Sequence, residues 1–284
     1  MLIAQISDLH LGFVPDDPAE MNARRLEAVL ARIAALPVQP DALIASGDLA
    51  DKGDEDAYRQ LREMLSDQPF PVHYMIGNHD SRAAFLSVFS DLPTADGFVQ
   101  YAAECGDLRL LVLDTLETGR HGGGFCEIRA RWLTDRLDEA PDRATVIALH
   151  HPPIDSGIGW LTTVPNEPWV QRLGNAIRGR GNIVALLGGH LHRSIATRFE
   201  GFPVVVCPPT APAAALTLTP IDPDHPDGRP LIVDVPPAYA LHLWRDGELV
   251  SHVDRVEPEP VVVRYDETML PLMQRVFRER PKTS

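Results

Sequence analysis

The sequence predicts an α/β protein in which at least one sheet is parallel. Short apolar runs alternate with longer segments that carry apolar residues at helical spacing, which is the pattern of βαβ units. Most of these runs are apolar throughout, as is typical of strands covered on both faces. Five of the runs end in Asp, Asn or His, and open α/β sheets place their ligand sites at such strand ends. We therefore expect one polar cluster at these strand ends.

The first unit is a strand, a helix and a second strand. Leu2–Ile6 is a short apolar run, and residues from about Ala19 to Leu36 form an apolar stripe with Arg25 on the outward face. Pro37 ends the helix, because proline cannot continue it. Ala42–Ala45 is the next buried run. A strand–helix–strand sequence predicts parallel pairing of the two strands.

The same alternation continues to about residue 190. Apolar periodicity, proline, glycine and capping residues set the boundaries of the elements. The predicted elements are a helix at Glu55–Leu65, a strand at Pro71–Ile76, a helix at Arg82–Phe89, strands at Phe98–Ala103 and Arg109–Asp114, a helix at Glu127–Leu137, a strand at Thr145–Leu149, a helix at Trp169–Arg178 and a strand at Ile183–Leu187. Ser81 is the expected N-cap of the third helix, Arg109 begins a strand of a second sheet, and Ile128 faces inward.

The chain changes character after residue 193, where consecutive strands replace the strand–helix alternation. The expected elements are strands at Ser194–Phe199, Val204–Cys207, Tyr239–Trp244 and Leu249–Val253, and a final helix at about Glu267–Phe277. Both strand pairs are expected to be antiparallel, because each is joined by a short turn that contains glycine. The pair around Asp246-Gly247 has the strongest short-turn signal in the chain.

Composition limits the possible partners. The 284 residues contain 26 Lys and Arg against 40 Asp and Glu, a formal charge of −14, so we expect neither a nucleic-acid polymer nor a membrane as a partner. A small anionic substrate stays possible, because bound divalent cations can reverse the local charge. Cys105, Cys126 and Cys207 form no CxxC pair, and no run fits a signal peptide or the ~20 residues of a membrane span. We expect a cytoplasmic protein.

Seven side chains with oxygen or nitrogen donors follow the predicted strands. They are Asp8, His10, Asp48, Asn78, His150, His190 and His192. Carboxylate, amide oxygen and imidazole suit Fe, Mn, Zn or Co better than soft, thiophilic ions. Each residue alone is weak evidence, since an isolated buried His is more often a satisfied core residue. Five such motifs at successive strand ends nevertheless favour one site for two divalent or transition metal ions, with Asp48 as the shared ligand.

This donor set predicts phosphate-ester hydrolysis. Two ions about 3.5–4 Å apart need a shared anionic ligand to offset their repulsion, and the Asp48 carboxylate provides one. A water that bridges the ions becomes hydroxide near neutral pH and attacks phosphorus in line, while the metals hold the phosphoryl oxygens. We therefore expect a phosphoesterase that uses a metal-bridging hydroxide.

These motifs, taken together, resemble the ordered signature of the calcineurin-like metallophosphoesterases. The matching segments are Asp8-Leu-His10, Gly47-Asp48, Gly77-Asn-His-Asp80, His150 and Gly189-His-Leu-His192. The resemblance covers residues 1 to about 210. It implies a four-layer αββα sandwich, in which two mixed β-sheets are flanked by helices, with a two-metal centre and a small C-terminal β extension or cap.

The resemblance also implies a role for each site residue. The first metal would be held by Asp8, His10, Asp48 and His192, and the second by Asp48, Asn78, His150 and His190. His79 would join Asp48 and Asn78 in the catalytic set by protonating the leaving oxygen, with structural packing as the alternative. His150 rather than His151 is the expected ligand, and His151 would pack or hydrogen-bond behind it. His121 could reach the substrate, but we expect it at the surface.

Two features favour phosphodiesters over phosphomonoesters. Protein phosphatases of this superfamily carry an Arg after the bridging Asp, where this chain has Lys52, which cannot form the bidentate fork that grips a dianion. His-His-Pro-Pro and the segment Val204–Pro212 resemble bacterial class III cyclic-nucleotide phosphodiesterases and their glycerophosphodiesterase relatives. We expect broad specificity with 3′,5′-cyclic nucleotides (cAMP) ahead. The alternatives are a glycerophosphodiesterase and, less favoured, a phosphomonoesterase or a non-catalytic scaffold.

Candidate substrate contacts follow from these alternatives. Trp160 or Phe125 could form an apolar shelf for a nucleobase, whereas Asn166 and Thr163 could serve a small polar leaving group.

The resemblance divides the chain into three segments. Residues 1–212 would form the catalytic domain, residues 213–260 a cap and dimerisation extension with a β-hairpin, and residues 261–284 a tail helix that packs on the core. A homodimer or higher homo-oligomer follows, and a β-extension of one monomer is the alternative.

Overall fold

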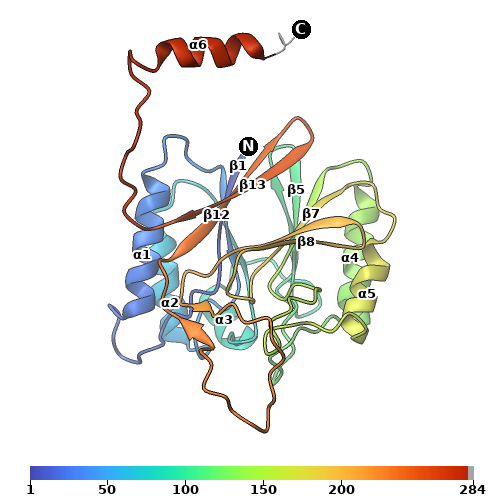
Figure 1. Cartoon of the computed structure of the whole chain (residues 1–284). Coiled ribbons are helices and arrows are strands. Elements are labelled where there is room, and N and C mark those ends of the chain that lie inside the picture. The colour runs from blue at the N-terminus through green and yellow to red at the C-terminus, as the bar shows by residue number, and fades with distance from the viewer. Residues whose placement is uncertain (281–284) are drawn as a thin grey trace.

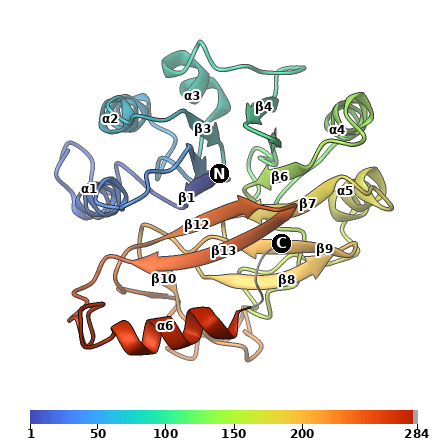
Figure 2. The same cartoon turned by 90° about the horizontal axis from the view of Figure 1, so that it is seen from above.

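Two large mixed β-sheets lie face to face in the centre of the molecule, and helices cover their outer faces (Figures 1 and 2). The structure is a computed structural model that describes residues 1–280. The first sheet contains β1 (Leu2–Ile6), β2 (Ala42–Ser46), β3 (Val72–Met75), β12 (Ala238–Arg245) and β13 (Glu248–Arg255). The second contains β4 (Tyr101–Cys105), β5 (Leu108–Leu113), β6 (Thr145–Leu149), β7 (Ile183–Gly188), β8 (Ile195–Phe199) and β9 (Phe202–Val206).

The predicted four-layer αββα sandwich is confirmed by the packing of the helices. The first sheet is covered by α1 (Met21–Ala34), α2 (Glu55–Leu65) and α3 (Arg82–Val88), and the second by α4 (Glu127–Glu139) and α5 (Pro168–Ile177). Successive side chains of a strand point to opposite faces. Ile3 and Ile44 therefore enter the core between the sheets, whereas Ala4 and Leu43 pack against the helices. This double burial explains the unbroken apolar runs.

Parallel pairing within each sheet places the functional strand ends together. β1, β2 and β3 are parallel neighbours in the first sheet, and β5, β6, β7 and β9 are parallel neighbours in the second. The antiparallel strands β4, β8, β12 and β13 extend the sheets outward. The carboxyl ends of β1, β2, β3, β6 and β7 consequently meet at one edge of the sandwich, where the candidate site lies.

Two predicted side-chain orientations are wrong, and in both cases an arginine is the reason. Ile128 is 51% exposed, while the adjacent Arg129 is buried on α4. The Arg129 guanidinium donates to the backbone carbonyl of Asp114, which compensates for its burial. Arg25 of α1 also turns inward and donates to the carbonyl of Thr210. Hydrophobic periodicity alone does not identify such buried, paired arginines.

The predicted hairpin near residue 246 is present and belongs to the first sheet. β12 and β13 pair around Asp246 and Gly247, which both have positive φ angles, and β12 pairs with β1. The preceding segment forms a short ladder of β10 (Ala213–Ala214) and β11 (Ile232–Val233). The division of the chain at residues 212 and 260 stays a prediction.

Helix α6 (Leu270–Glu279) follows an irregular segment and lies apart from the sandwich (Figure 1). It has no buried residue, so the packing of the tail on the core stays a prediction, and residues 281–284 lie outside the described part of the chain. None of the helices in residues 1–280 has both the length and the apolar character that a membrane crossing requires.

Candidate metal centre

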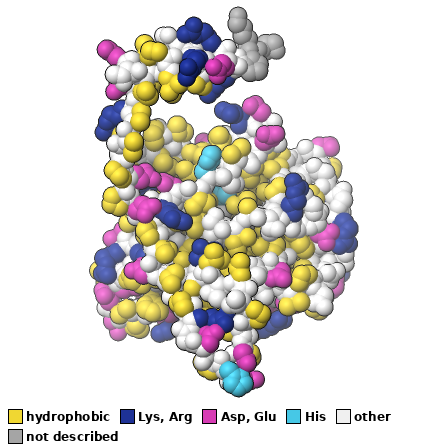
Figure 3. All heavy atoms as spheres, in the orientation of Figure 1, with side chains coloured by type: hydrophobic (Ala, Val, Ile, Leu, Met, Phe, Trp, Pro, Cys, Tyr) yellow, Lys and Arg dark blue, Asp and Glu magenta, His cyan; other side chains and the backbone are white. Residues whose placement is uncertain are grey.

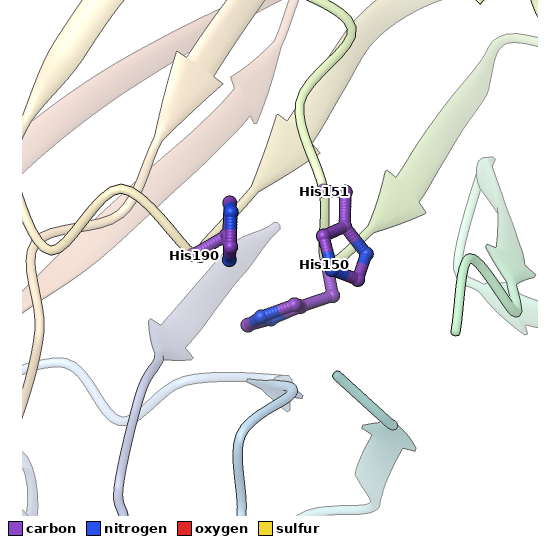
Figure 4. Close-up of side chains that lie close together, drawn as sticks. All are labelled: His150, His151 and His190. Atoms are coloured by element: carbon purple, nitrogen blue, oxygen red, sulfur yellow. The ribbon is translucent and has the colours of Figure 1, made fainter. Parts of the chain in front are cut away.

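All the candidate ligands lie in loops at one edge of the sandwich. Asp8, His10, Asp48 and His192 form one group in which a donor atom of each residue lies within 4.8 Å of the others, and His150, His151 and His190 form a second such group. Figure 4 shows the three imidazoles of the second group converging from two neighbouring loops. The remaining candidate, Asn78, joins the second group because its Oδ1 lies 3.1 Å from His151 Nε2. The predicted side chains are therefore brought together.

The backbone of this site is in a sparsely populated conformation. Asp8, His10, Asp48, His190 and His192 have φ angles of 53°, 48°, 47°, 67° and 48°. Residues other than glycine rarely adopt positive φ, and such strain tends to occur at functional sites, where the surrounding structure holds it. Five of the seven candidate ligands share this conformation.

Glycine at two positions lets the loops approach closely. A Cβ atom on Gly77 would overlap Oδ1 of Asp48 and stand 2.5 Å from Nε2 of His150. A Cβ atom on Gly189 would overlap the hydroxyl of Ser7 and stand 3.2 Å from Oδ2 of Asp8. Any larger residue would therefore displace the candidate ligands.

The first group has the chemistry of a cation site. Nε2 of His10 lies 3.1 Å from Nε2 of His192, which in turn lies 3.5 Å from Oδ1 of Asp8. Nδ1 of His192 donates to the carbonyl of Pro212 at 2.8 Å, so its Nε2 carries a lone pair toward the group. Oδ2 of Asp8 is buried and has no hydrogen-bond partner in the described chain. A bound cation would satisfy these facing acceptors.

The second group is connected to the first through Asp48. Nδ1 of His150 donates to the carbonyl of Ser46 at 2.7 Å, which directs Nε2 of His150 toward Oδ2 of Asp48 at 3.2 Å. Nε2 of His10, a member of the first group, lies 3.8 Å from the same oxygen. The Asp48 carboxylate thus lies between the two groups, as a shared ligand requires.

The charges of the site are paired. Burial by itself would raise the pKa of Asp48, but the charge and hydrogen bond of His150 outweigh it and hold that pKa well below its usual value. Burial acts against His150 as well, yet Asp48 raises the pKa of His150 to about 9. Burial, together with the neighbouring His150, holds the pKa of His151 well below its usual value. Burial and the neighbouring His151 and His150 do the same to the pKa of His190. The Asp48 carboxylate is therefore paired with an imidazolium at His150, and the rings of His151 and His190 beside this pair are neutral.

Asp80 joins the loops that carry Asp48 and Asn78, a role that the sequence motif alone does not reveal. Its carboxylate accepts the backbone N–H groups of Leu49, Ala50 and Gly77 and the hydroxyl of Tyr58. Burial and the neighbouring Asp48 charge raise the pKa of Asp80 to about 6. This carboxylate fixes the distance between the two loops.

A cavity of about 290 Å³ opens beside the donor groups. Its polar wall includes His10, Asp48, Asp51, Asn78, His79, His121, His190 and His192, and its apolar wall includes Phe13, Met21, Trp160, Leu161 and Ile232. Trp160 is therefore available to a substrate. The alternative shelf, Phe125, is 1% exposed and packs in the core of the second sheet. Neither Asn166 nor Thr163 lines the cavity, and the Thr163 hydroxyl donates to Pro152.

His79 is fixed at the edge of this cavity. Its backbone N–H donates to Oδ1 of Asp48, and its Nδ1 donates to the carbonyl of Asp51, both at 2.9 Å. The Asp51 carboxylate also lies 3.3 Å from Nδ1 of His10, so Asp51 is a site residue that motif matching misses. Lys52 is exposed and does not line the cavity.

His121 is exposed, as expected, but it also reaches the cavity. Its ring centroid lies 5.0 Å from that of His190 in an edge-on arrangement. Burial of the inner part of the ring lowers its pKa. Its position in a glycine-rich loop was the signal that it could reach the substrate.

Fold and site together define an αββα sandwich with a candidate metal centre at its strand ends. A family model described as calcineurin-like phosphoesterase matches residues 1–194, and the chain belongs to that family.

Individual relatives agree with this assignment. The cAMP/cGMP dual specificity phosphodiesterase of Mycobacterium tuberculosis (strain CDC 1551 / Oshkosh) is 33% identical over 231 residues, which cover 76% of this chain and 70% of that protein. The glycerophosphodiester phosphodiesterase GpdQ of Enterobacter lignolyticus (strain SCF1) is 27% identical over 264 residues, which cover 89% of this chain and 90% of that protein. A crystal structure of a dimetal phosphatase from Danio rerio shares the fold, with a TM-score of 0.65, 15% identity and coverage of 90% of this chain and 96% of that chain.

Proposed function

We propose that this chain is a phosphodiesterase that hydrolyses small phosphodiesters with two bound metal ions, and that 3′,5′-cyclic nucleotides are its preferred substrates. The observation that carries the proposal is the position of Asp48 between two groups of buried nitrogen and oxygen donors. The proposed ligands of the first ion are Asp8, His10, Asp48 and His192, and those of the second are Asp48, Asn78, His150 and His190. Divalent Fe, Mn, Zn or Co suits these donors.

The contribution of the protein is to hold the donor atoms and the leaving group in place. When bound, two divalent ions activate a water for attack on phosphorus and stabilise charge on the phosphoryl oxygens. His150 and His192 each donate from Nδ1 to a backbone carbonyl, which reserves Nε2 for a cation. His79 is anchored through Nδ1 in the same way, so its Nε2 is the atom that can protonate the leaving oxygen.

His79→Gln is expected to slow hydrolysis to a degree that depends on the leaving group of the substrate. The hydrolysis of cAMP should fall by about 100-fold, because loss of a general acid costs most when the leaving alkoxide is strongly basic. The hydrolysis of bis(p-nitrophenyl) phosphate should fall much less, since p-nitrophenolate leaves without a proton. Steady-state kinetics on both substrates provide the comparison. Equal losses on the two would show that His79 is not the acid.

The apolar wall of the cavity supports cyclic nucleotides over glycerophosphodiesters. A nucleobase has a flat apolar face that can stack on Trp160, whereas a glycerol group has none. One relative, from Mycobacterium tuberculosis, is named for cAMP and cGMP, while GpdQ of Enterobacter lignolyticus is named for glycerophosphodiesters and matches more of the chain. A glycerophosphodiesterase is therefore the second candidate.

Trp160→Ala is expected to raise KM for cAMP by about tenfold, because stacking of a base on an aromatic ring is worth roughly 1–3 kcal/mol. KM for glycerophosphoethanolamine should stay within a factor of two. Trp160→Phe keeps an aromatic face and should retain most of the affinity for cAMP. An unchanged KM for cAMP in the alanine variant would remove the support for a base shelf.

A hydrolysis panel tests the proposed function itself. The chain, loaded with Mn²⁺, Fe²⁺, Zn²⁺ or Co²⁺, would be assayed against cAMP, 2′,3′-cyclic AMP, glycerophosphoethanolamine and p-nitrophenyl phosphate. We expect diester hydrolysis with cAMP at the highest kcat/KM and slow hydrolysis of the monoester, since Lys52 does not supply a clamping arginine. If no metal supports diester hydrolysis, a non-catalytic scaffold is the better assignment.

We also propose that the chain acts in the cytoplasm as a homodimer or higher homo-oligomer. Its three cysteines are free, with Cys105 and Cys207 buried, which suits a reducing compartment. The tail carries Val262 and Phe277 at 91% and 61% exposure. Figure 3 shows hydrophobic side chains at the surface of the tail segment. A second copy of the chain could cover such apolar side chains. Sedimentation equilibrium of the full chain measures the oligomeric state.

A further inference from the structure

His151 is fully buried between a threonine hydroxyl and the candidate ligand Asn78. Both His151 and Thr115 are 0% exposed. His151 follows β6 and Thr115 follows β5 at equivalent positions. The two strands are paired with Leu149 opposite Leu113, so the two residues come to lie side by side. Nδ1 of His151 lies 2.9 Å from the Thr115 hydroxyl, and Nε2 lies 3.1 Å from Oδ1 of Asn78. The imidazole thus connects the second sheet to the loop after β3.

The hydrogen bonds determine which nitrogen of His151 carries the proton. A carbonyl oxygen only accepts, so Nε2 must donate to Oδ1 of Asn78. A buried imidazole that is hydrogen-bonded only to neutral groups is itself neutral, so Nδ1 is the acceptor. The Thr115 hydroxyl accepts the backbone N–H of His151 at 3.3 Å and has its own proton left to donate to Nδ1. We call these linked hydrogen bonds from Thr115 through His151 to Asn78 the relay. Every polar atom of the relay has a partner of the right kind.

The ring has no room to leave this position. A Cβ atom on Gly123 would stand 2.9 Å from Cβ of His151, so the glycine backbone packs against it. The ring centroids of His150 and His190 lie 4.8 and 4.6 Å away (Figure 4). A buried ring held on three sides and hydrogen-bonded at both nitrogens is a rigid support.

We propose that His151, oriented by Thr115, is a positioning residue that fixes the side-chain amide of Asn78. Donation from Nε2 occupies one lone pair of Oδ1 and leaves the other available to the second metal ion. The same hydrogen bond directs the amide nitrogen of Asn78 away from His151. The expected consequence of this positioning is tighter binding of the second ion, and that consequence rests on the proposed function. The hydrogen bonds of His151 do not depend on the proposed function.

A competing arrangement would make His151 itself a metal ligand in place of Asn78. Its nitrogen belongs to the same donor group as those of His150 and His190. A ligand nitrogen must be unprotonated, so that arrangement requires the proton on Nδ1 and donation to Thr115. The two arrangements therefore predict opposite tautomers of one imidazole ring.

The first experiment needs no metal ion. Long-range ¹H–¹⁵N correlation spectra of the full chain in EDTA report the tautomer of each histidine, and His151→Phe assigns the signal. We expect the Nε2–H tautomer for His151. Observation of the Nδ1–H tautomer would overturn the proposal, whatever the enzyme hydrolyses.

The second experiment measures Mn²⁺ binding by titration calorimetry. Thr115→Val keeps the shape of the side chain and removes the hydroxyl. We expect it to lower the affinity for one of the two Mn²⁺ ions roughly 10-fold. Thr115→Ser restores the hydroxyl and should bind within a factor of two of the original chain. Thr134→Val is a matched control, because its hydroxyl only donates to Ala130 on α4. Equal affinities in the Thr115→Val and Thr134→Val variants would contradict the relay.

A double-mutant cycle then distinguishes support of Asn78 from direct ligation. If His151 acts through Asn78, His151→Phe should weaken Mn²⁺ binding in the original chain and change it less than twofold in the Asn78→Ala background. Additive losses would overturn the proposal in favour of direct ligation by His151. If the original chain binds fewer than two Mn²⁺ ions, the proposed two-metal function fails, while the tautomer result keeps its own meaning.

Discussion

Asp48→Asn is expected to reduce diester hydrolysis by about a thousandfold or more, which corresponds to roughly 4 kcal/mol of transition-state stabilisation. The substitution removes the negative charge that the two proposed metal sites share. It keeps the size of the side chain and the oxygen that accepts the N–H of His79. Metal content and kcat/KM, measured on the same preparation, check the prediction. Both metal sites should weaken, whereas loss of a ligand to one ion, as in His192→Ala, should spare the other.

A matched control separates the shared-ligand role from a general effect of charge. Asp138→Asn makes the same chemical change on α4, where the carboxylate pairs with Arg180 at the surface. Its metal content and turnover should equal those of the original chain. If Asp48→Asn still bound two metal ions with unchanged affinity, Asp48 would not be the shared ligand.

Gly77→Ala is expected to inactivate the enzyme, although Gly77 is not itself a candidate ligand. The added methyl group would overlap the Asp48 carboxylate and the His150 imidazole. Neither neighbour can yield, because His150 is bonded to Ser46 and the loop of Asp48 is tied to that of Gly77 through Asp80. Overpacking of this kind costs about 1–3 kcal/mol of stability, and a displacement near 1 Å lowers activity by about 100-fold.

The effect of Gly77→Ala is measured by chemical denaturation and steady-state kinetics. Gly181→Ala is the control, because a Cβ atom there has no neighbour within 4 Å and no positive φ opposes it. That variant should keep both its stability and its turnover. A Gly77→Ala protein with normal turnover would show that the loops are not held rigidly.

The strand-end residues could be predicted because they depend on local sequence and on one topological rule. Apolar runs identify strands, parallel pairing brings their carboxyl ends to one edge, and the motif residues follow directly. Ser81 was predicted in the same way, and its hydroxyl caps α3 by accepting from Ala84. Such features depend only on the residues that lie within a few positions of them in the sequence.

Contacts between distant segments could not be predicted. Asp51, Asp80 and Thr115 enter the site through partners that only the tertiary fold brings close. Phe125 had the right chemistry for a base shelf, but it is buried in the core of the second sheet. The inward turn of Arg129 depends in the same way on carbonyl groups from another loop.

In the metal-loaded chain, Asp48 is expected to lie between two metal ions. Anomalous diffraction from crystals of the full chain grown with Mn²⁺ tests it most directly. We expect two peaks per chain on either side of the Asp48 carboxylate, one among Asp8, His10 and His192, and one among Asn78, His150 and His190. A single peak, or two peaks of which only one contacts Asp48, would show that Asp48 is not a shared ligand.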